Sequence, residues 1–234
     1  MGSYHMWFLY MIASMYLLTP ILQKVTESDQ LTRYFMVLSI LFGSLLPTLI
    51  SCVRLRYEGL AEIAQGAANQ LDLGMVGGFS LYYVGGYYFH KTELSNKKRK
   101  ILYVLAIASL IFTVAGTAGI TMWKGIATEL FYLPMSPNVI CMSAGVFVFG
   151  KYHFQGVEFS KKTTAWLRKL SKYSFGAYLV HVFVMLLLQF KWGLHALTFH
   201  PIISTPIVLL VTAVVSYAIS AVLNSIPGVN KYLV

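Results

Sequence analysis

His181 is the ionisable residue whose place in the sequence points most directly to chemistry. It lies within the apolar run KYSFGAYLVHVFVM at residues 172–185. Counted from Ser171, at 1.5 Å per residue, His181 lies roughly 15 Å into a membrane span, halfway through a hydrocarbon core of ~30 Å. An ionisable side chain at that depth is costly unless it faces a partner or a wet cavity, so His181 indicates a functional site.

Two polar residues accompany His181 on the expected helix. Ser174 and Tyr178 precede it by seven and three positions, which places all three on nearly one helix face. His181 could orient or deprotonate a hydroxyl group, or it could make a structural hydrogen bond to a neighbouring helix. Ser174 and Tyr178 could extend a polar substrate-binding stripe, or serve only in hydrogen bonds between helices.

The composition predicts the fold that positions these residues. Of the 234 residues, 57% are hydrophobic and 11% are charged, whereas soluble domains carry about 25% charged residues. Apolar segments of spanning length lie at 6–22, 34–53, 74–89, 101–122, 136–150, 173–190 and 202–223. We therefore expect an all-α, polytopic transmembrane helix bundle of about seven spans, forming a single domain over residues 1–234.

The lysines and arginines predict the orientation of this bundle. They gather in the first, third and fifth loops, at 23–33, 90–100 and 151–172, and are few in the others. Because basic loops remain in the cytoplasm, we expect the N-terminus outside and the C-terminus in the cytoplasm. The net charge of +10 is explained by this topology, so no nucleic-acid partner is expected. The third and fifth spans are short and rich in glycine, which predicts close packing inside the bundle.

An outer loop, RLRYEGLAEIAQGAANQLDL at 54–73, has apolar residues at helical spacing. This pattern predicts a short amphipathic helix on the outer surface. Arg54 and Arg56 at its start could hold an anionic acceptor or a lipid-linked glycan phosphate. They could equally be interface arginines that extend their charged groups toward water.

Four stretches together resemble the membrane-bound acyltransferase 3 family. The opening YHMWFLYMIASMYLLTPIL (4–22) resembles that family's pattern Y-H-L-W-F-L-Y…L-Y-L-L-x-P, and YSFGAYLVH (173–181) resembles its S-F-G-x-Y-L-x-H segment. GFSLYYVGGYYF (78–89) is similar to its Y-F-x-x-G-Y-x-x segment, and IPGVNKYLV (226–234) to its usual ending. The resemblance covers essentially the whole chain.

The resemblance implies an O-acyltransferase of the bacterial inner membrane. Such an enzyme transfers an acyl group, often acetyl from acetyl-CoA or another acyl-CoA, to a hydroxyl of a cell-surface glycan or lipid-linked sugar. His181 would then be catalytic, with Ser174 and Tyr178 near the substrate. His5 becomes a second catalytic candidate and Trp7 a substrate-binding one, on the acceptor side with Arg54 and Arg56. The alternative for His5 is a solvated terminal residue beside an interfacial tryptophan. No metal is expected.

The chain departs from the family at its front. Family members usually have about ten core spans, with a catalytic histidine in the first and an R-x-x-R arginine pair in the early helices. Neither has a matching position here, so we expect about three spans to be missing from the front. Arg54 and Arg56 have a different spacing and do not represent that pair. The chain could be an N-terminally truncated fragment or one half of a split enzyme. In the membrane lipid it could also form a homo-oligomer.

The residues leave other interpretations of the function open. The basic clusters at 97–100 and 161–172 could meet the phosphates of CoA, although topology and anionic lipid also account for them. A small-molecule or proton-coupled transporter would use His181 as a relay residue. Against it stand the lack of a second charge within a span and of an inverted repeat. A non-catalytic assembly partner is the third reading. Cys52 and Cys141 are expected to be free buried thiols.

Overall fold

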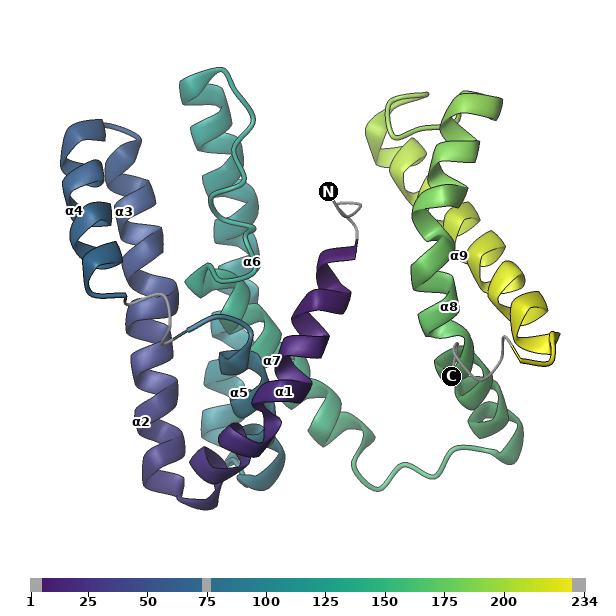
Figure 1. Cartoon of the computed structure of the whole chain (residues 1–234), viewed down its shortest axis with the longest axis horizontal. Coiled ribbons are helices and arrows are strands. Elements are labelled where there is room, and N and C mark those ends of the chain that lie inside the picture. Colours follow the sequence, from purple (N-terminus) through teal and green to yellow (C-terminus); the bar gives the residue numbers. More distant parts are fainter. Residues whose placement is uncertain (1–5, 73–76, 229–234) are drawn as a thin grey trace. The chain divides into compact units, whose positions relative to one another are not determined.

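The computed structural model describes residues 6–72 and 77–228. In chain order the helices are α1 (Trp7–Glu27), α2 (Asp29–Ile40), the π-helical turn η2 (Leu41–Leu45), α3 (Leu46–Arg54), α4 (Glu58–Gln70), α5 (Ser80–Lys91), α6 (Asn96–Lys124), α7 (Pro137–Phe154), α8 (Lys161–Trp192) and α9 (Pro201–Ser225) (Figure 1). The regular structure in the described ranges is helical throughout, which confirms the predicted all-α class.

The chain divides into two compact units, which are described separately. The larger unit extends from Leu9 to Val157 and contains most of α1 and all of α2 to α7. The smaller unit combines Glu158–Val234 with Met1–Phe8, so that α8 and α9 are grouped with the first turn of α1. A single domain over residues 1–234 stays a prediction.

Five helical stretches among the described residues are long and apolar enough to cross a membrane. They are α1, the continuous rod Asp29–Arg54 made of α2, η2 and α3, and the helices α6, α8 and α9. The segments predicted at 74–89 and 136–150 correspond to α5 and α7, with 12 and 18 residues. At 1.5 Å per residue, α5 advances only about 18 Å, less than a ~30 Å hydrocarbon core. The count of seven spans and their orientation stay predictions.

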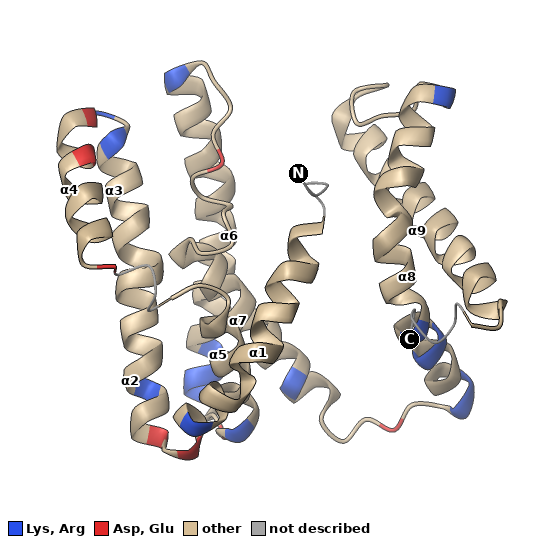
Figure 2. Ribbon diagram, in the orientation of Figure 1, with Lys and Arg blue, Asp and Glu red and all other residues tan. Residues whose placement is uncertain are grey.

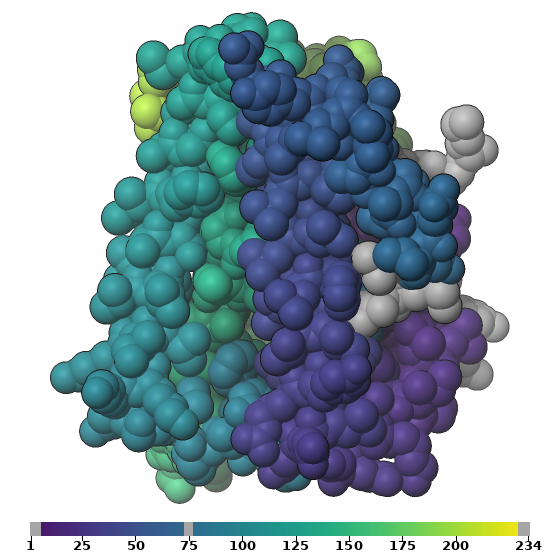
Figure 3. All heavy atoms as spheres, turned by 90° about the vertical axis from the view of Figure 1, so that its left-hand side faces the viewer, coloured from purple at the N-terminus to yellow at the C-terminus, as the bar shows by residue number. Residues whose placement is uncertain are grey.

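Two short helices run back along the Asp29–Arg54 rod. α4 follows α3 after the turn at 55–57 and packs against it, whereas α5 packs against α2 and α7. The space-filling view shows α3 and α4 side by side, with α7 seen between the rod and α6 (Figure 3). α4 and α5 together therefore accompany the whole rod, with a break in the helix between Gln70 and Ser80.

This break lies at half the height of the rod. Gly43, in the turn η2, approaches Gly77 so closely that a Cβ atom on Gly43 would lie 2.7 Å from the Gly77 Cα. The loop between α6 and α7 reaches the same level, because the Ser44 hydroxyl donates to the Met135 carbonyl at 2.6 Å. The Tyr82 hydroxyl donates to the carbonyl of Pro134. In a membrane, non-helical backbone at such depth is tolerated only where protein surrounds it or where it lines a water-filled cavity.

α6 and α7 pack through small residues, as the glycine content predicted. A Cβ atom on Gly145 of α7 would lie 2.4 Å from the Ala106 Cβ of α6, so the two backbones are in close approach. At the start of α7 the buried Asn138 donates to the Thr113 hydroxyl at 2.7 Å. Close packing of the fifth predicted segment is thereby confirmed within the larger unit.

The predicted amphipathic segment at 54–73 is a helix over Glu58–Gln70. Its packing differs from the sequence pattern, because Ala61 is the buried residue, whereas Leu60 and Ile63 are 58% and 73% exposed. The small Ala61 allows α4 to lie close against α3, which leaves the larger apolar side chains on the outside. A position at the membrane surface stays a prediction.

The smaller unit is a helical hairpin. α8 begins after Ser160, whose hydroxyl accepts from the Thr163 amide at 3.1 Å, and it ends at Gly193, which has a φ of 61°. Such a left-handed residue commonly ends a helix, and glycine adopts it without steric cost. α9 then begins with Pro201 and packs against α8.

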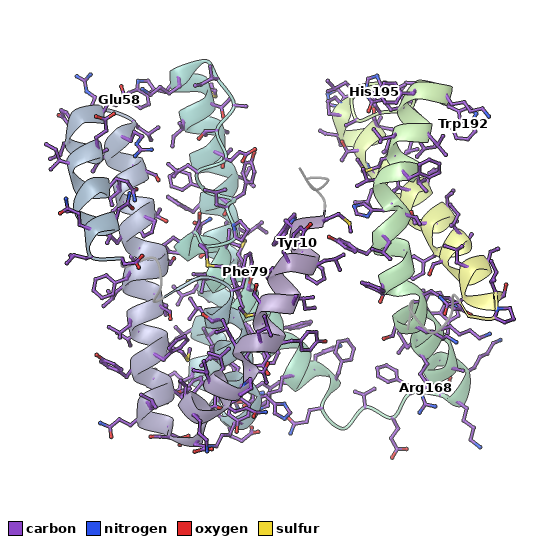
Figure 4. All side chains as sticks on the ribbon, viewed as in Figure 1. Tyr10, Glu58, Phe79, Arg168, Trp192 and His195 are labelled. Atoms are coloured by element: carbon purple, nitrogen blue, oxygen red, sulfur yellow. The ribbon has the colours of Figure 1, made fainter. Side chains whose placement is uncertain are left out.

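Basic residues gather at one end of each unit (Figure 2). In the larger unit that end carries Lys24, Arg33, Lys91, Lys97, Lys98, Arg99, Lys100 and Lys151. The opposite end carries Arg54, Arg56 and Lys124. In the hairpin, Arg168 lies toward one end of α8, whereas Trp192 and the neighbouring His195 lie at the other (Figure 4). These asymmetries match the charge pattern from which the orientation was predicted.

Candidate functional site

His181 lies on α8, 20 residues after Lys161 and 11 before Trp192, so it is deep within this candidate span. Its Nδ1 atom is hydrogen-bonded to the carbonyl oxygen of Tyr178, one turn earlier. A carbonyl oxygen can only accept, so a neutral His181 carries its proton on Nδ1 and presents an unprotonated lone pair on Nε2. The residue is half-buried, and Nε2 is the nitrogen that is unprotonated in this tautomer.

Aromatic rings lie beside His181 within the smaller unit. The Tyr178 ring is centred 5.4 Å from the imidazole. The edge of Phe8 contacts Tyr178 at 5.3 Å between ring centres, and Trp7 is 6.2 Å from Phe8. Residues 7 and 8 belong to the same compact unit as α8. The structure thus brings the start of α1 to Tyr178 through Phe8, and Tyr178 lies one helix turn before His181. Trp7 is the sequence neighbour of Phe8.

Ser174 has a hydrogen bond within its own helix. Its hydroxyl donates to the Ser171 carbonyl at 2.7 Å, and the residue is exposed. Seven positions separate it from His181 on α8, which is about two turns and roughly 10 Å of rise. Its proposed contact with substrate stays a prediction. His5 lies outside the described residues.

Arg54 and Arg56 lie in the larger unit, at the end of the rod opposite the strongly basic end. Both are exposed, and the Arg56 guanidinium lies 6.0 Å from the centre of the Tyr57 ring. Arg54 lines a shallow hollow of about 260 Å³, in which Lys124 is a second cation and Thr128 a hydroxyl. Two cations at one hollow can hold an anion, so a role in binding an anionic acceptor stays a prediction.

A polar stripe along α9 was not recognised from the sequence. Thr212, Ser216, Ser220 and Asn224 recur at every fourth position and are between 0% and 7% exposed. The Ser220 hydroxyl donates to the Tyr173 carbonyl of α8 at 2.8 Å. The hydroxyls of Thr212 and Ser216 have no hydrogen-bond partner among the described residues. The signal was present, since four polar residues at helical spacing in an apolar span define one face.

The packing register shows where this stripe lies along α8. Gly176 of α8 faces Ser220 of α9, and the two helices of the hairpin run in opposite directions. One turn further along each helix, Ser216 comes level with residue 180, next to His181. Unpaired buried hydroxyls are uncommon because they lose hydration without compensation. Ser216 and Thr212 are therefore buried hydroxyls in the α8–α9 interface, on a different face of α8 from His181.

The basic end of the larger unit is held together by Lys151. Its ammonium group donates to the carbonyls of Phe89, His90 and Thr92 at 3.0–3.1 Å and pairs with Glu93 at 3.0 Å. These contacts cap the C-terminal end of α5, where a cation is favourable. Both the hydrogen bond from Lys151 and a second from the Tyr152 hydroxyl lower the pKa of Glu93 below its usual 4.5. Lys151 is thus engaged in structure.

Thiols and possible metal ligands are the remaining reactive side chains of the described residues. Cys52 and Cys141 are free cysteines, as predicted, but they are half-buried rather than buried. Within residues 6–72 and 77–228, no three histidine, cysteine or acidic side chains lie together in a way that could hold a metal ion. The chemistry that the described residues offer is that of an imidazole, hydroxyls and cations.

Five long apolar helical stretches among the described residues, one of which carries His181, define an all-helical membrane protein. The acyltransferase domain family matches residues 1–221, so the chain belongs to the membrane acyltransferase 3 family. This match confirms the resemblance that the sequence motifs indicated. No curated protein and no solved structure matches the chain.

Proposed function

We propose that this protein is an integral membrane O-acyltransferase that transfers an acyl group from acyl-CoA to a hydroxyl of a cell-surface sugar or glycan. Membership of the acyltransferase 3 family supports the reaction class. The observation that supports His181 as the catalytic residue is the hydrogen bond between its Nδ1 atom and the Tyr178 carbonyl. It leaves Nε2 free of a proton at a depth where an ionisable group is costly without a task.

The proposed reaction uses His181 first as a base and then as an acid. Nε2 takes the proton of the acceptor hydroxyl while the hydroxyl oxygen attacks the thioester carbonyl carbon, so that a C–O bond forms. The C–S bond then breaks, and the leaving CoA sulfur receives that proton from the imidazolium. The products are an ester and free CoA thiol. The Tyr178 carbonyl keeps the ring oriented throughout, and it stabilises the imidazolium through the Nδ1 proton.

The aromatic cluster supports the acceptor assignment. The Tyr178 ring lies beside the imidazole, Phe8 contacts Tyr178, and Trp7 contacts Phe8. Aromatic rings present an apolar surface with polar groups at the edge, which suits a sugar with its hydroxyls at one side. In the larger unit, Arg54 and Arg56 would hold an anionic part of a lipid-linked acceptor. The membrane that contains the protein would be the bacterial inner membrane.

The test is CoA release from acetyl-CoA and longer acyl-CoAs by the purified chain in lipid, with a mixed pool of glycan acceptors. We expect His181→Ala to lower the rate by about a hundredfold or more, the usual contribution of a general base. His195→Ala is the matched control, because His195 lies in the exposed loop of the same unit. Equal rates for the wild type and His181→Ala would contradict the proposal. If turnover requires co-expression of a three-span front segment, the hypothesis that the chain is an assembly partner of a separate front half is favoured.

One observation favours a second candidate, a small-molecule or proton-coupled transporter. Discontinuous helices at mid-membrane depth are typical of transporter binding sites, and the larger unit has such a break between α4 and α5. In that case His181 would relay protons and CoA would not be consumed. Uptake or efflux that depends on His181, measured in vesicles without acyl-CoA, would support the transporter and weigh against the transferase.

A further inference from the structure

A partly open cavity of about 300 Å³ lies in the larger unit, between α2, α5, α6 and α7. Its lining is formed by Met36, Ile40, Leu81, Tyr82, Gly85, Gly86, Phe89, Leu102, Ile140, Cys141, Ser143, Ala144 and Phe147. The volume is at the lower end of that of small-molecule pockets. Because packed helices normally leave few gaps, a hollow of this size between four helices is a candidate ligand site.

The walls of the cavity select an apolar occupant. Tyr82 and Ser143 bring hydroxyls, but these are already engaged, with the carbonyls of Pro134 and Val139. Apart from the weakly polar Cys141 thiol, the remaining lining side chains are hydrocarbon, thioether or aromatic. A polar ligand would lose its hydration here without regaining hydrogen bonds.

A pair of glycines keeps the cavity open. A Cβ atom on Gly85 would approach only Met36 Cε at 3.9 Å, and one on Gly86 only Phe147 Cε2 at 4.0 Å, which are ordinary contacts. Gly145, by contrast, would place its Cβ 2.4 Å from Ala106. Gly85 and Gly86 are therefore not required for close helix approach, and adjacent glycines inside a helix cost stability. What they provide is empty space on the face of α5 that lines the cavity.

The length of the cavity limits the occupant. Its lining follows α5 from Leu81 to Phe89, which corresponds to about 12 Å at 1.5 Å per residue. One leaflet of a bilayer core, filled by one lipid tail, is ~15 Å thick. The cavity therefore accommodates a single chain shorter than the tails of the surrounding lipid, and far longer than an acetyl group.

The strongly basic end of the unit lies next to the cavity. Each of three lining helices carries a cation within about one turn of its last lining residue: Lys91 follows Phe89, Arg99 precedes Leu102, and Lys151 follows Phe147. Lys91 pairs with Asp29 and Lys151 with Glu93. Arg99 lies 4.2 Å from the centre of the Tyr152 ring, and its Nε atom is buried without a hydrogen-bond partner among the described residues. An occupant with an anionic head group is thus favoured at this end.

We propose that this cavity binds the acyl chain of a medium-chain acyl-CoA, so that the donor is a fatty acyl thioester longer than acetyl. The inference rests on the proposed acyl-CoA-dependent function and specifies its donor. The CoA part of the thioester would extend from the cavity past the basic end at Arg99 and the lysines at 97–100, with its phosphates beyond the pantetheine arm. Each methylene buried in such a cavity raises affinity by about three- to fourfold.

Alkylation of Cys141 reports on the cavity without requiring turnover. The full chain carrying Cys52→Ser, in lipid nanodiscs, is treated with N-ethylmaleimide in the presence of acetyl-, octanoyl- or palmitoyl-CoA. We expect octanoyl-CoA to protect Cys141 at a concentration at least about tenfold lower than acetyl-CoA. Gly85→Leu and Gly86→Leu fill the cavity and should abolish this preference. Gly119→Leu, on α6 with nothing within 4 Å, is the matched control and should retain it.

Smaller substitutions and two further ligands complete the test. If the leucine variants do not fold, Gly85→Ala and Gly86→Ala should weaken the preference for octanoyl-CoA in the same direction. Equal protection by sodium octanoate or by octanoyl-lysophosphatidylcholine would assign the cavity to a lipid tail and overturn the donor assignment. If no chain protects Cys141 while acetyl-CoA is still consumed, the cavity inference fails and the proposed function stands. Protection by octanoyl-CoA without any acyl transfer would support the cavity and contradict the proposed function.

Discussion

The two units of this protein achieve helix packing in opposite ways. In the hairpin, α8 and α9 are continuous over 32 and 25 residues and meet through small and hydroxyl side chains at Gly176 and Ser220. In the larger unit, the Asp29–Arg54 rod contains a π-helical turn, and the helical path along it is interrupted between α4 and α5. A cavity lies between α2, α5, α6 and α7. The hairpin shows how continuous helices pack closely, and the larger unit shows how interrupted helices leave space between them.

The difference concerns what glycine does in each place. At Gly176, Gly145 and the Gly43–Gly77 contact, the absence of a side chain lets two backbones approach, which is the usual basis of helix association in lipid. At Gly85 and Gly86, the absence of a side chain leaves space unfilled. Substitution with alanine separates the two cases, because only the first creates a collision.

The largest effect is expected at the break in the larger unit. Gly43→Ala would place a Cβ atom 2.7 Å from the Gly77 Cα, and a backbone atom cannot rotate away. We expect a loss of about 2 kcal/mol or more in the free energy of unfolding, as for overpacked cores. The measurement is reversible unfolding in mixed micelles.

Gly66→Ala is the matched control for Gly43→Ala. Gly66 lies on α4 with nothing within 4 Å of the added Cβ atom. The substitution should stabilise the protein by about 0.4–1 kcal/mol, because alanine restricts the unfolded chain. Similar effects of the two alanines would contradict the close approach of Gly43 and Gly77.

A smaller loss is expected in the hairpin. Gly176→Ala would bring its Cβ to 2.3 Å from the Ser220 hydroxyl, which can rotate aside but then gives up its bond to the Tyr173 carbonyl. We expect a loss of about 1–2 kcal/mol. Combined with Ser220→Ala, the collision with the hydroxyl disappears, so the double variant should be more stable than the sum of the single losses predicts. Strict additivity in this cycle would show that the two helices do not meet here.

The smallest effect is a pH dependence at the basic end of the larger unit. The Lys151 ammonium and the Tyr152 hydroxyl lower the pKa of Glu93 in the folded protein below its usual 4.5. The carboxylate therefore contributes stability above pH 4.5, and this contribution is lost as the pH falls through the lowered pKa. The difference in unfolding midpoint between the wild type and Glu93→Gln should shrink on acidification.

Glu62→Gln provides the control for this titration. Glu62 is exposed on α4 in the same unit, so its replacement should leave the pH profile close to that of the wild type. A difference between the wild type and Glu93→Gln that stays constant with pH would contradict the pairing of Glu93 with Lys151.

Much of the fold could be predicted from the sequence because lipid imposes simple rules. Apolar runs identified the five long spanning candidates, glycines in the fifth segment predicted its close packing, and the motif around His181 indicated the family. The helix at 58–70 was also expected, although Ala61 rather than Leu60 or Ile63 is buried. Periodicity shows that one face is apolar, but whether that face meets protein or lipid depends on the neighbours.

The break between α4 and α5 and the cavity could not be predicted from the sequence in this way. A window of apolar letters at 74–89 does not show that α5 starts only at Ser80, because the break depends on the distant contact between Gly43 and Gly77. The cavity is formed by four helices, so no single stretch contains its pattern. For the site, the sequence indicated Tyr178 and His181 together, whereas the buried Ser216 emerged from the packing of α8 on α9.

The interruption between α4 and α5 has a consequence for biosynthesis. α4 carries Glu58, Glu62 and Gln65, and α5 has only 12 residues, so neither is a favourable insertion signal by itself. In the structure α4 packs against α3 of the rod, and α5 packs against α2 and α7. Because the ribosome delivers α7 after both, the packing of α5 can be completed only once α7 has been synthesised.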